Sequence, residues 1–413
     1  MTISLQRTFE PGLPPNDEHP YRSGVWRPQH REYDAWDMEV AGEIPTDLNG
    51  VYLRNTENPL FEPIKRYHPF DGDSMMHSIS FENGEARYSN RFVRTDAFLA
   101  EQEAKASLWA GIAEHPSNAT ADYGWGARTF MKDNASTDVV VHGGAALASF
   151  YQCGELYRLD PRTLEDLGKT TWNGFFPTEG VSAHPKVDEH TGDLLFFSYF
   201  TDAPYMRYGV VSRTGELTNH VDIPLPGPRL PHDMAFTENW SILNDLPLFW
   251  SPEALADGHY SNTFDRNLPS RFALIPRHGS TEDILWFEAD PTFVLHWTNA
   301  YEEGDWVILD GFLHVFLIKC YRNCAEEPLQ ADSEITRNCQ KGSETTLTKR
   351  RERKRNDRNE WKRIYKRNET ERNATTFETR NQMTRNETRA DSCKFRMNAK
   401  KQCRKIYDTR HAM

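Results

Sequence analysis

Cysteine is nearly absent from the first three quarters of this 413-residue sequence, where Cys153 alone precedes Cys320. So few thiols argue against the disulfide framework of a small secreted scaffold. Long apolar runs are also missing, since the longest candidate, 312–318, falls far short of the ~18 residues that a membrane-spanning helix needs. The first 20 residues lack the apolar stretch of a secretory signal. We therefore expect a soluble, cytoplasmic protein.

Glycine, proline and tryptophan become scarce near residue 320, and the charge changes sign there. Only one of the 24 glycines and one of the 24 prolines lie beyond residue 320. Residues 321–413 hold 25 basic and 14 acidic side chains, whereas the preceding 320 hold 24 basic and 47 acidic ones. The net charge of −12 therefore combines two different kinds of polypeptide. We expect an N-terminal arm over 1–40, one structured domain over 41–311 and a separate tail over 312–413.

Short alternating runs separated by glycine-containing turns dominate the middle of the chain. Residues 75–81 alternate apolar and polar side chains before Asn83-Gly84, a pair typical of two-residue hairpin turns. Similar runs surround Gly143-Gly144 and Gly215. Helical patterns are few, the best covering 95–113. The sequence predicts an all-β fold, and the patterning alone leaves sandwich, barrel and propeller open.

The tail is rich in Asn, Thr, Glu, Arg and Lys and contains near-repeats at 367–370 and 385–388. Its aliphatic residues are too sparse to form a core face, so we expect disorder outside any compact core. Basic tails can bind nucleic acid, but charge runs are more often solvated surface, and we expect no nucleic-acid partner. A reading-frame error or an artificial junction is the alternative that we favour.

Common local motifs for metal or nucleophile chemistry, such as HExxH, paired CxxC and GxSxG, do not occur. Three histidines have distinctive surroundings: His184 in an AHPK run, His232 in a PHD run and His296 in an HWTNAYEE run. Each alone is more often a hydrogen-bonded core residue than a ligand. Their separations of 48 and 64 residues establish no metal site.

These runs belong to an ordered set of motifs by which the chain resembles the carotenoid cleavage oxygenase family. That family includes apocarotenoid oxygenases, lignostilbene dioxygenases and the retinal pigment epithelium isomerohydrolase. The resemblance covers roughly residues 35–311, and its motifs are Gly42–Gly50, Phe70–His77, Tyr157–Pro161, Ala183–Lys186, Pro231–Asp233, Arg271–Gly279 and His296–Gly304. Ser74 departs from the family's usual glycine.

The resemblance implies a seven-bladed β-propeller that holds a non-haem iron(II) through four histidines. His184, His232 and His296 would be the first three ligands. Neutral imidazoles suit iron(II) and leave positions open for dioxygen. Thr137 matches the family threonine that lies beside the open position and restricts access to it.

Two departures from the family pattern bear on this site. The fourth histidine lies near the family's C-terminus, whereas only His314 and His411 follow His296 here, neither in the expected motif. The sequence therefore predicts an incomplete propeller without its last blades. Gln152 stands where the family commonly has a glutamate that orients an iron ligand, so the position brings no charge.

The resemblance also bears on the substrate. Ile112 and Tyr151 align with the tyrosine and lysine by which lignostilbene-cleaving members hold a phenolic oxygen. Both replacements favour an apolar tunnel and hence a carotenoid or apocarotenoid, cleaved at a conjugated double bond into two carbonyl products. Dioxygen and a lipophilic polyene are the expected partners, with peripheral membrane contact during substrate uptake as a further expectation. The alternatives are cleavage of a lignostilbene or phenylpropene, and a truncated propeller without activity.

Overall fold

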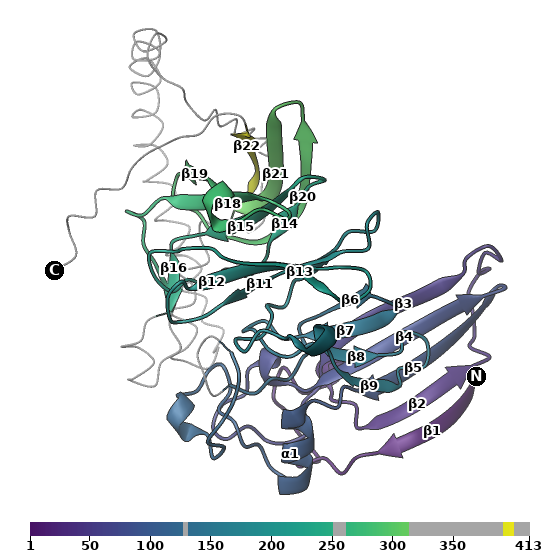
Figure 1. The fold of residues 1–413 in the computed structure, drawn as a ribbon. Helices are drawn as coiled ribbons and strands as arrows, with labels where there is room; N and C mark the ends of the chain where they lie inside the picture. The colour runs from purple at the N-terminus through teal and green to yellow at the C-terminus, as the bar shows by residue number, and fades with distance from the viewer. Residues whose placement is uncertain (127–130, 251–261, 314–390, 400–413) are drawn as a thin grey trace, which may run out of the picture. The chain divides into compact units, whose positions relative to one another are not determined.

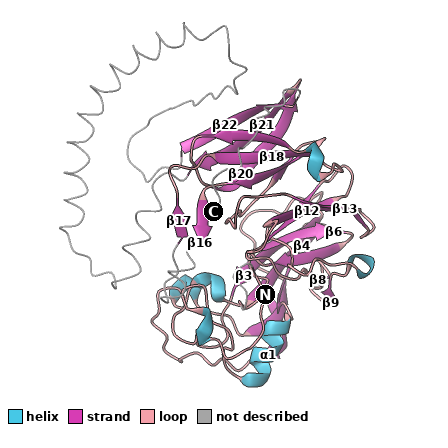
Figure 2. Ribbon diagram, turned by 60° about the vertical axis from the view of Figure 1, so that its left-hand side comes forward, coloured by secondary structure: helices cyan, strands magenta, loops and turns pink. Residues whose placement is uncertain are grey.

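The computed structural model describes residues 1–126, 131–250, 262–313 and 391–399. The chain divides into two compact units, residues 1–315 with 380–413, and residues 316–379. The second unit lies outside the described residues. Strands are the predominant regular secondary structure of the first unit's described residues, as Figure 2 shows. The prediction of an all-β fold is confirmed.

The first sheet has five antiparallel strands in the order β1-β2-β5-β4-β3. Asn83 and Gly84 form the predicted hairpin turn between β4 and β5, at φ angles of 53° and 79°. A two-residue turn of this kind needs positive φ at both positions, which asparagine and glycine tolerate best. The five strands are β1 (Thr2–Thr8), β2 (Arg31–Trp36), β3 (Gly50–Glu57), β4 (Ser74–Glu82) and β5 (Glu85–Phe92).

Two sheets of four consecutive antiparallel strands come next along the chain (Figure 1). Gly143 and Gly144 form the predicted turn between the first two strands, both with positive φ. The first of these sheets contains β6 (Asp138–His142), β7 (Ala145–Ser149), β8 (Tyr157–Leu159) and β9 (Asp166–Lys169). The second contains β10 (Lys186–Val187), β11 (Leu194–Tyr199), β12 (Met206–Val211) and β13 (Leu217–Asp222).

The remaining strands form three further sheets. A four-stranded sheet contains β14 (Ala235–Phe236), β15 (Trp240–Asp245), β18 (Ser270–Pro276) and β19 (Leu285–Ala289). The hairpin between β15 and β18 consists of β16 (Leu248–Trp250) and β17 (Asn262–Phe264). The last sheet contains β20 (Val294–Glu303), β21 (Trp306–Leu313) and β22 (Asp391–Asn398).

Edge strands of several sheets lie beside one another. β6 contacts both β3 and β10, and β14 contacts β20. Successive antiparallel sheets joined at one edge are typical of propeller blades. The described residues do not form a closed ring, so the seven blades and their expected incompleteness stay predictions.

Helix is confined to one α-helix and short 3₁₀ turns in the described residues. The helix predicted over 95–113 is shorter, since α1 covers only Asp96–Ala104. Thr95 caps its first turn by accepting a hydrogen bond from the Phe98 backbone, and Lys105 ends it in the left-handed conformation. The 3₁₀ turns are η1 (Gly24–Trp26), η2 (Pro69–Asp71), η3 (Pro116–Asn118), η4 (Trp172–Gly174) and η5 (Thr281–Asp283).

The two ends of the chain differ from the sequence-based expectation. Instead of forming a separate arm, residues 1–40 add β1 and β2 to the first sheet. The tail was expected to lie outside any core, yet β22 pairs with β21 over its whole length. Phe395 and Met397 are buried against Phe272 and Leu309 in the same apolar cluster. Alternation of apolar and polar side chains over eight residues suffices for a strand, and the polar average composition of the 102-residue tail hides such a short run.

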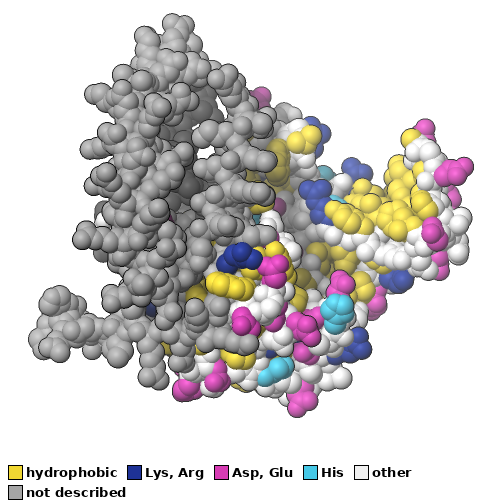
Figure 3. Space-filling view, turned by 90° about the horizontal axis from the view of Figure 1, so that it is seen from above, with side chains coloured by type: hydrophobic (Ala, Val, Ile, Leu, Met, Phe, Trp, Pro, Cys, Tyr) yellow, Lys and Arg dark blue, Asp and Glu magenta, His cyan; other side chains and the backbone are white. Residues whose placement is uncertain are grey.

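The outer surface of the described residues mixes apolar and charged side chains. On the face drawn in Figure 3, apolar side chains gather on one part of the surface and acidic side chains lie around them. Ile3, Leu5 and Tyr52 of the first sheet are among the exposed apolar residues. No helix in the described ranges is long and apolar enough to cross a membrane.

Candidate metal centre

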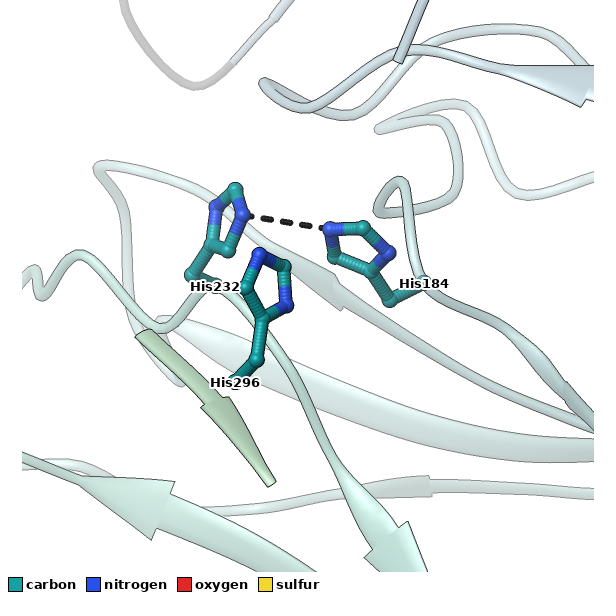
Figure 4. A group of neighbouring side chains, drawn as sticks. All are labelled: His184, His232 and His296. Atoms are coloured by element: carbon teal, nitrogen blue, oxygen red, sulfur yellow. Dashed lines mark hydrogen bonds between the residues drawn. The ribbon is translucent and has the colours of Figure 1, made fainter. Parts of the chain in front are cut away.

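The three histidines singled out in the sequence lie at the starts of three different sheets. His184 precedes β10, His232 precedes β14, and His296 lies near the start of β20. These strands occupy the edges at which the sheets meet, so residues far apart in sequence lie side by side. Figure 4 shows the three rings facing one another.

The spacing of the rings fits a shared metal ion. The Nε2 atoms of His184 and His232 are 3.1 Å apart, and candidate ligand atoms from all three residues lie within 4.8 Å of one another. Two nitrogens bonded at about 2.1 Å and at right angles to one metal are separated by about 3 Å. The three residues could therefore hold a metal ion, and their role as ligands stays a prediction.

The environment of His232 keeps its imidazole neutral. Burial, reinforced by the neighbouring His184 and His296, lowers the pKa of His232 to about 3. A neutral ring presents a lone pair to a metal, whereas a protonated ring does not. His184 is buried as well, while 52% of the His296 side chain is exposed. The donor set thus suits a divalent transition metal, and it opens to solvent on the side of His296.

Asp138 at the start of β6 holds the ring of His184. Its Oδ2 atom accepts a hydrogen bond from Nδ1 of His184 at 2.8 Å. The Oδ1 atom accepts from the Val139 backbone at 2.8 Å, which fixes the carboxylate. A histidine that donates from Nδ1 keeps Nε2 free of a proton and available to a metal. Sequence reasoning missed Asp138, although it directly follows Thr137.

Asp233, the last residue of the PHD motif, is the second carboxylate of the centre. Its Oδ2 atom is 3.6 Å from Nδ1 of His296, and its Oδ1 atom is 2.5 Å from the Lys186 ammonium. Burial favours the neutral acid, but His296 and Lys186 more than offset it and hold the pKa of Asp233 well below its usual range. Asp233 is therefore a buried anion between two ligand-bearing segments.

Thr137 is joined to the backbone next to the centre. Its Oγ1 atom accepts a hydrogen bond from the Tyr151 backbone at 3.1 Å, and its own N–H donates to Ser149 at 3.0 Å. The side chain is half-buried and adjoins Asp138 in sequence. A role beside an open metal position stays a prediction.

Ile112 and Tyr151, predicted to line a substrate tunnel, lie in one buried apolar cluster with Met131, Phe150 and Ala183. Ala183 directly precedes His184, so this cluster borders the centre. Its side chains carry no charge. The structure thus brings Ile112 and Tyr151 together in one cluster, and their contact with a substrate stays a prediction.

Gln152 is buried, and its Oε1 atom has no hydrogen-bond partner in the described part of the chain. No hydrogen bond among the described residues joins it to His184, His232 or His296. The role of Gln152 beside an iron ligand therefore stays a prediction. The two remaining candidates for a fourth ligand, His314 and His411, lie outside the described residues.

Comparison with known proteins assigns the chain to one family. A family model described as retinal pigment epithelial membrane protein matches residues 26–409. An isoeugenol monooxygenase of Pseudomonas nitroreducens is 33% identical over 78% of this chain and 67% of its own length. A carotenoid 9,10(9',10')-cleavage dioxygenase of Pisum sativum is 32% identical over 74% of this chain and 59% of its own.

Solved structures agree with this assignment. The lignostilbene dioxygenase of Pseudomonas brassicacearum has a TM-score of 0.64 and 28% identity, covering 74% of this chain and 64% of that one. A cobalt-substituted Synechocystis apocarotenoid oxygenase has a TM-score of 0.60 and 26% identity over similar shares, 74% and 64%. The chain therefore spans about three fifths to two thirds of the length of these relatives. It belongs to the carotenoid cleavage oxygenase family, whose named members are oxygenases.

Proposed function

We propose that the protein is an iron(II)-dependent oxygenase that cleaves a conjugated C=C bond of a carotenoid or apocarotenoid into two carbonyl products. The observation that carries this proposal is the convergence of three histidines from three sheets beside an uncharged apolar cluster. Neutral imidazoles suit iron(II), and the relatives are oxygenases. When bound, the iron would supply the site at which dioxygen is activated.

The residues of this chain would divide the remaining work. His184, His232 and His296 would hold the metal, and Asp138 would keep the His184 ring in the orientation that presents Nε2. The cluster around Ile112 and Phe150 would exclude water and receive an apolar chain, because desolvation of such a chain favours binding. Thr137 would fix the Tyr151 backbone at the border between these two parts.

The apolar cluster also supports the choice of substrate. A polyene makes only dispersion and hydrophobic contacts, which uncharged Ile112, Met131 and Phe150 can provide. The ring of Phe70 packs edge-on against the ring of Tyr151, with their centroids 5.8 Å apart. A phenolate would be favoured by a charged partner, and this cluster has none, although the Tyr151 hydroxyl could donate a hydrogen bond to it.

A second candidate is cleavage of a phenylpropene or lignostilbene. It is supported by the names of two relatives, the isoeugenol monooxygenase and the lignostilbene dioxygenase. The two candidates share the metal and differ in the pocket. Dioxygen is a proposed partner in both, whereas the membrane contact and the cytoplasmic location stay predictions without support.

The test is an oxygen-uptake assay on the 413-residue chain reconstituted with iron(II). An apocarotenal, isoeugenol and lignostilbene are offered separately, and the carbonyl products are identified by mass. We expect uptake with the apocarotenal and none after His232→Ala. His220→Ala is the matched control, because His220 lies on β13, at the opposite edge of the sheet that begins near His184.

The outcomes separate the alternatives. Cleavage of a phenolic alkene alone would favour the second candidate. Tight iron binding without turnover of any of the three would contradict the proposed activity and favour the inactive propeller considered from the sequence.

A further inference from the structure

The carboxylate of Asp233 makes contacts that go beyond His296. Its Oδ1 atom lies 2.5 Å from the Lys186 ammonium and accepts a hydrogen bond from the Met234 backbone at 2.8 Å. Its Oδ2 atom accepts from the Trp297 backbone at 3.1 Å and lies 3.6 Å from Nδ1 of His296. One side chain thus meets four partners.

These partners represent all three histidine segments. Lys186 follows His184 by two residues, Met234 follows His232 by two, and Trp297 directly follows His296. The segments belong to three different sheets, and hydrogen bonds within a sheet cannot set the distance between sheets. Asp233 connects them directly.

The position of Asp233 makes these contacts strong. The carboxylate is only 2% exposed, so its hydrogen bonds and ion pair act with little screening by solvent. Its main chain is also fixed, because the Asp233 carbonyl accepts a hydrogen bond from the Asn244 amide of β15 at 2.6 Å. The anion is therefore held in place from both its side chain and its backbone.

We propose that Asp233 is a positioning residue that sets the mutual placement of the three histidines and thereby determines metal affinity. The proposal rests on the metal centre proposed above and is independent of the substrate. Loss of the charge would loosen Lys186 from the centre and weaken the contacts with the Trp297 backbone and His296. Residues that support metal ligands in this way typically contribute 10- to 100-fold to metal affinity.

The experiment measures cobalt(II) binding to the metal-free 413-residue chain by optical titration, with the visible spectrum as a reporter of coordination geometry. We expect Asp233→Asn to weaken cobalt(II) binding at least 10-fold and to change the spectrum. Glu32→Gln is the matched control, since Glu32 is a 2% exposed carboxylate that also has one cation partner, Arg94, and one backbone donor, Phe92. It lies on β2, and we expect its Kd to stay within twofold of wild type even if unfolding requires less urea.

A second pair of variants guards against a folding defect in Asp233→Asn. Lys186→Met removes the cation from a position that is 28% exposed, and Lys186→Arg retains it. We expect Lys186→Met to weaken cobalt(II) binding about threefold or more, and Lys186→Arg to stay closer to wild type.

Wild-type affinity and spectrum in both Asp233→Asn and Lys186→Met would overturn the positioning role while leaving the metal centre intact. Equal weakening in Glu32→Gln would also overturn it, because the effect would then follow general stability. Failure of the wild-type chain to bind cobalt(II) more tightly than His232→Ala would overturn the metal centre itself.

Discussion

Asp138 accepts a hydrogen bond from Nδ1 of His184 at 2.8 Å, and the opposite nitrogen of that ring faces His232 at 3.1 Å. The two residues are separated by 46 positions and join the edge of one sheet to the edge of the next. The contact fixes which nitrogen of His184 carries the proton. Asp138 thereby sets the orientation of one of the three histidines of the candidate metal centre.

We predict that Asp138→Ala weakens cobalt(II) binding about 10-fold, because the His184 ring loses both its orientation and a charged acceptor. Asp138→Asn keeps an acceptor oxygen and should have a smaller effect. Optical titration of the metal-free protein measures both. Asp222→Ala, which removes an exposed partner of Arg207, is the control and should leave the affinity unchanged. Equal Kd values for Asp138→Ala and wild type would contradict the role.

The hydroxyl of Thr137 should be needed for local stability. In Thr137→Val the Tyr151 backbone N–H loses its acceptor at nearly unchanged side-chain volume, which costs about 1–3 kcal/mol of unfolding free energy. Thr137→Ser retains the hydroxyl and should lose much less. Urea unfolding measures the difference. Equal stability of the valine and serine variants would argue against the hydrogen bond.

The tail strand β22 should contribute substantially to stability. Phe395 is 6% exposed, and the centroid of its ring lies 4.9 Å from that of Phe272. Phe395→Ala is therefore expected to lower the unfolding free energy by about 3–4 kcal/mol through lost burial and the resulting cavity. Arg396, on the same strand as Phe395, forms an exposed ion pair with Glu303 of β20, and Arg396→Ala should cost less than about 1 kcal/mol. Unfolding midpoints that match for the two variants would show that β22 does not pack on this sheet.

Asp133 should make stability depend on pH. Burial raises the pKa of its carboxyl to about 7, although hydrogen bonds from the Glu155 and Ala135 backbones lower it. The folded protein therefore keeps this proton up to a higher pH than the unfolded chain does. The contribution of Asp133 is most favourable below pH 3.8, its ordinary value, and is lost as the pH rises toward 7.

We predict that Asp133→Asn, which lacks this titration, gains stability relative to wild type between pH 4 and pH 8, by at most about 4 kcal/mol. The unfolding free energies of both proteins, measured in urea across that range, give the comparison. Parallel curves for the two proteins would contradict the prediction.

Local features could be predicted well because their causes are local. Asn83 and Gly84 adopt the positive φ angles that a tight hairpin needs, whatever lies around them. The helix prediction over 95–113 failed at its end for a reason that involves a side chain. The Glu101 carboxylate accepts a hydrogen bond from the Leu108 backbone N–H at 2.9 Å. The chain beyond Lys105 can therefore leave the helix while this N–H keeps an acceptor.

The all-β character could be predicted, and His184, His232 and His296 could be singled out, because turn residues and family motifs are properties of short segments of the sequence. The contacts of Asp138 with His184 and of Asp233 with His296, and the burial of Phe395 in a core, are visible only in the folded chain. The physical reason is that a carboxylate acts on whatever lies within a few ångströms, and those neighbours come from other sheets. Asp233 meets Lys186 and Trp297 across 47 and 64 positions of chain, a distance over which local patterns carry no information.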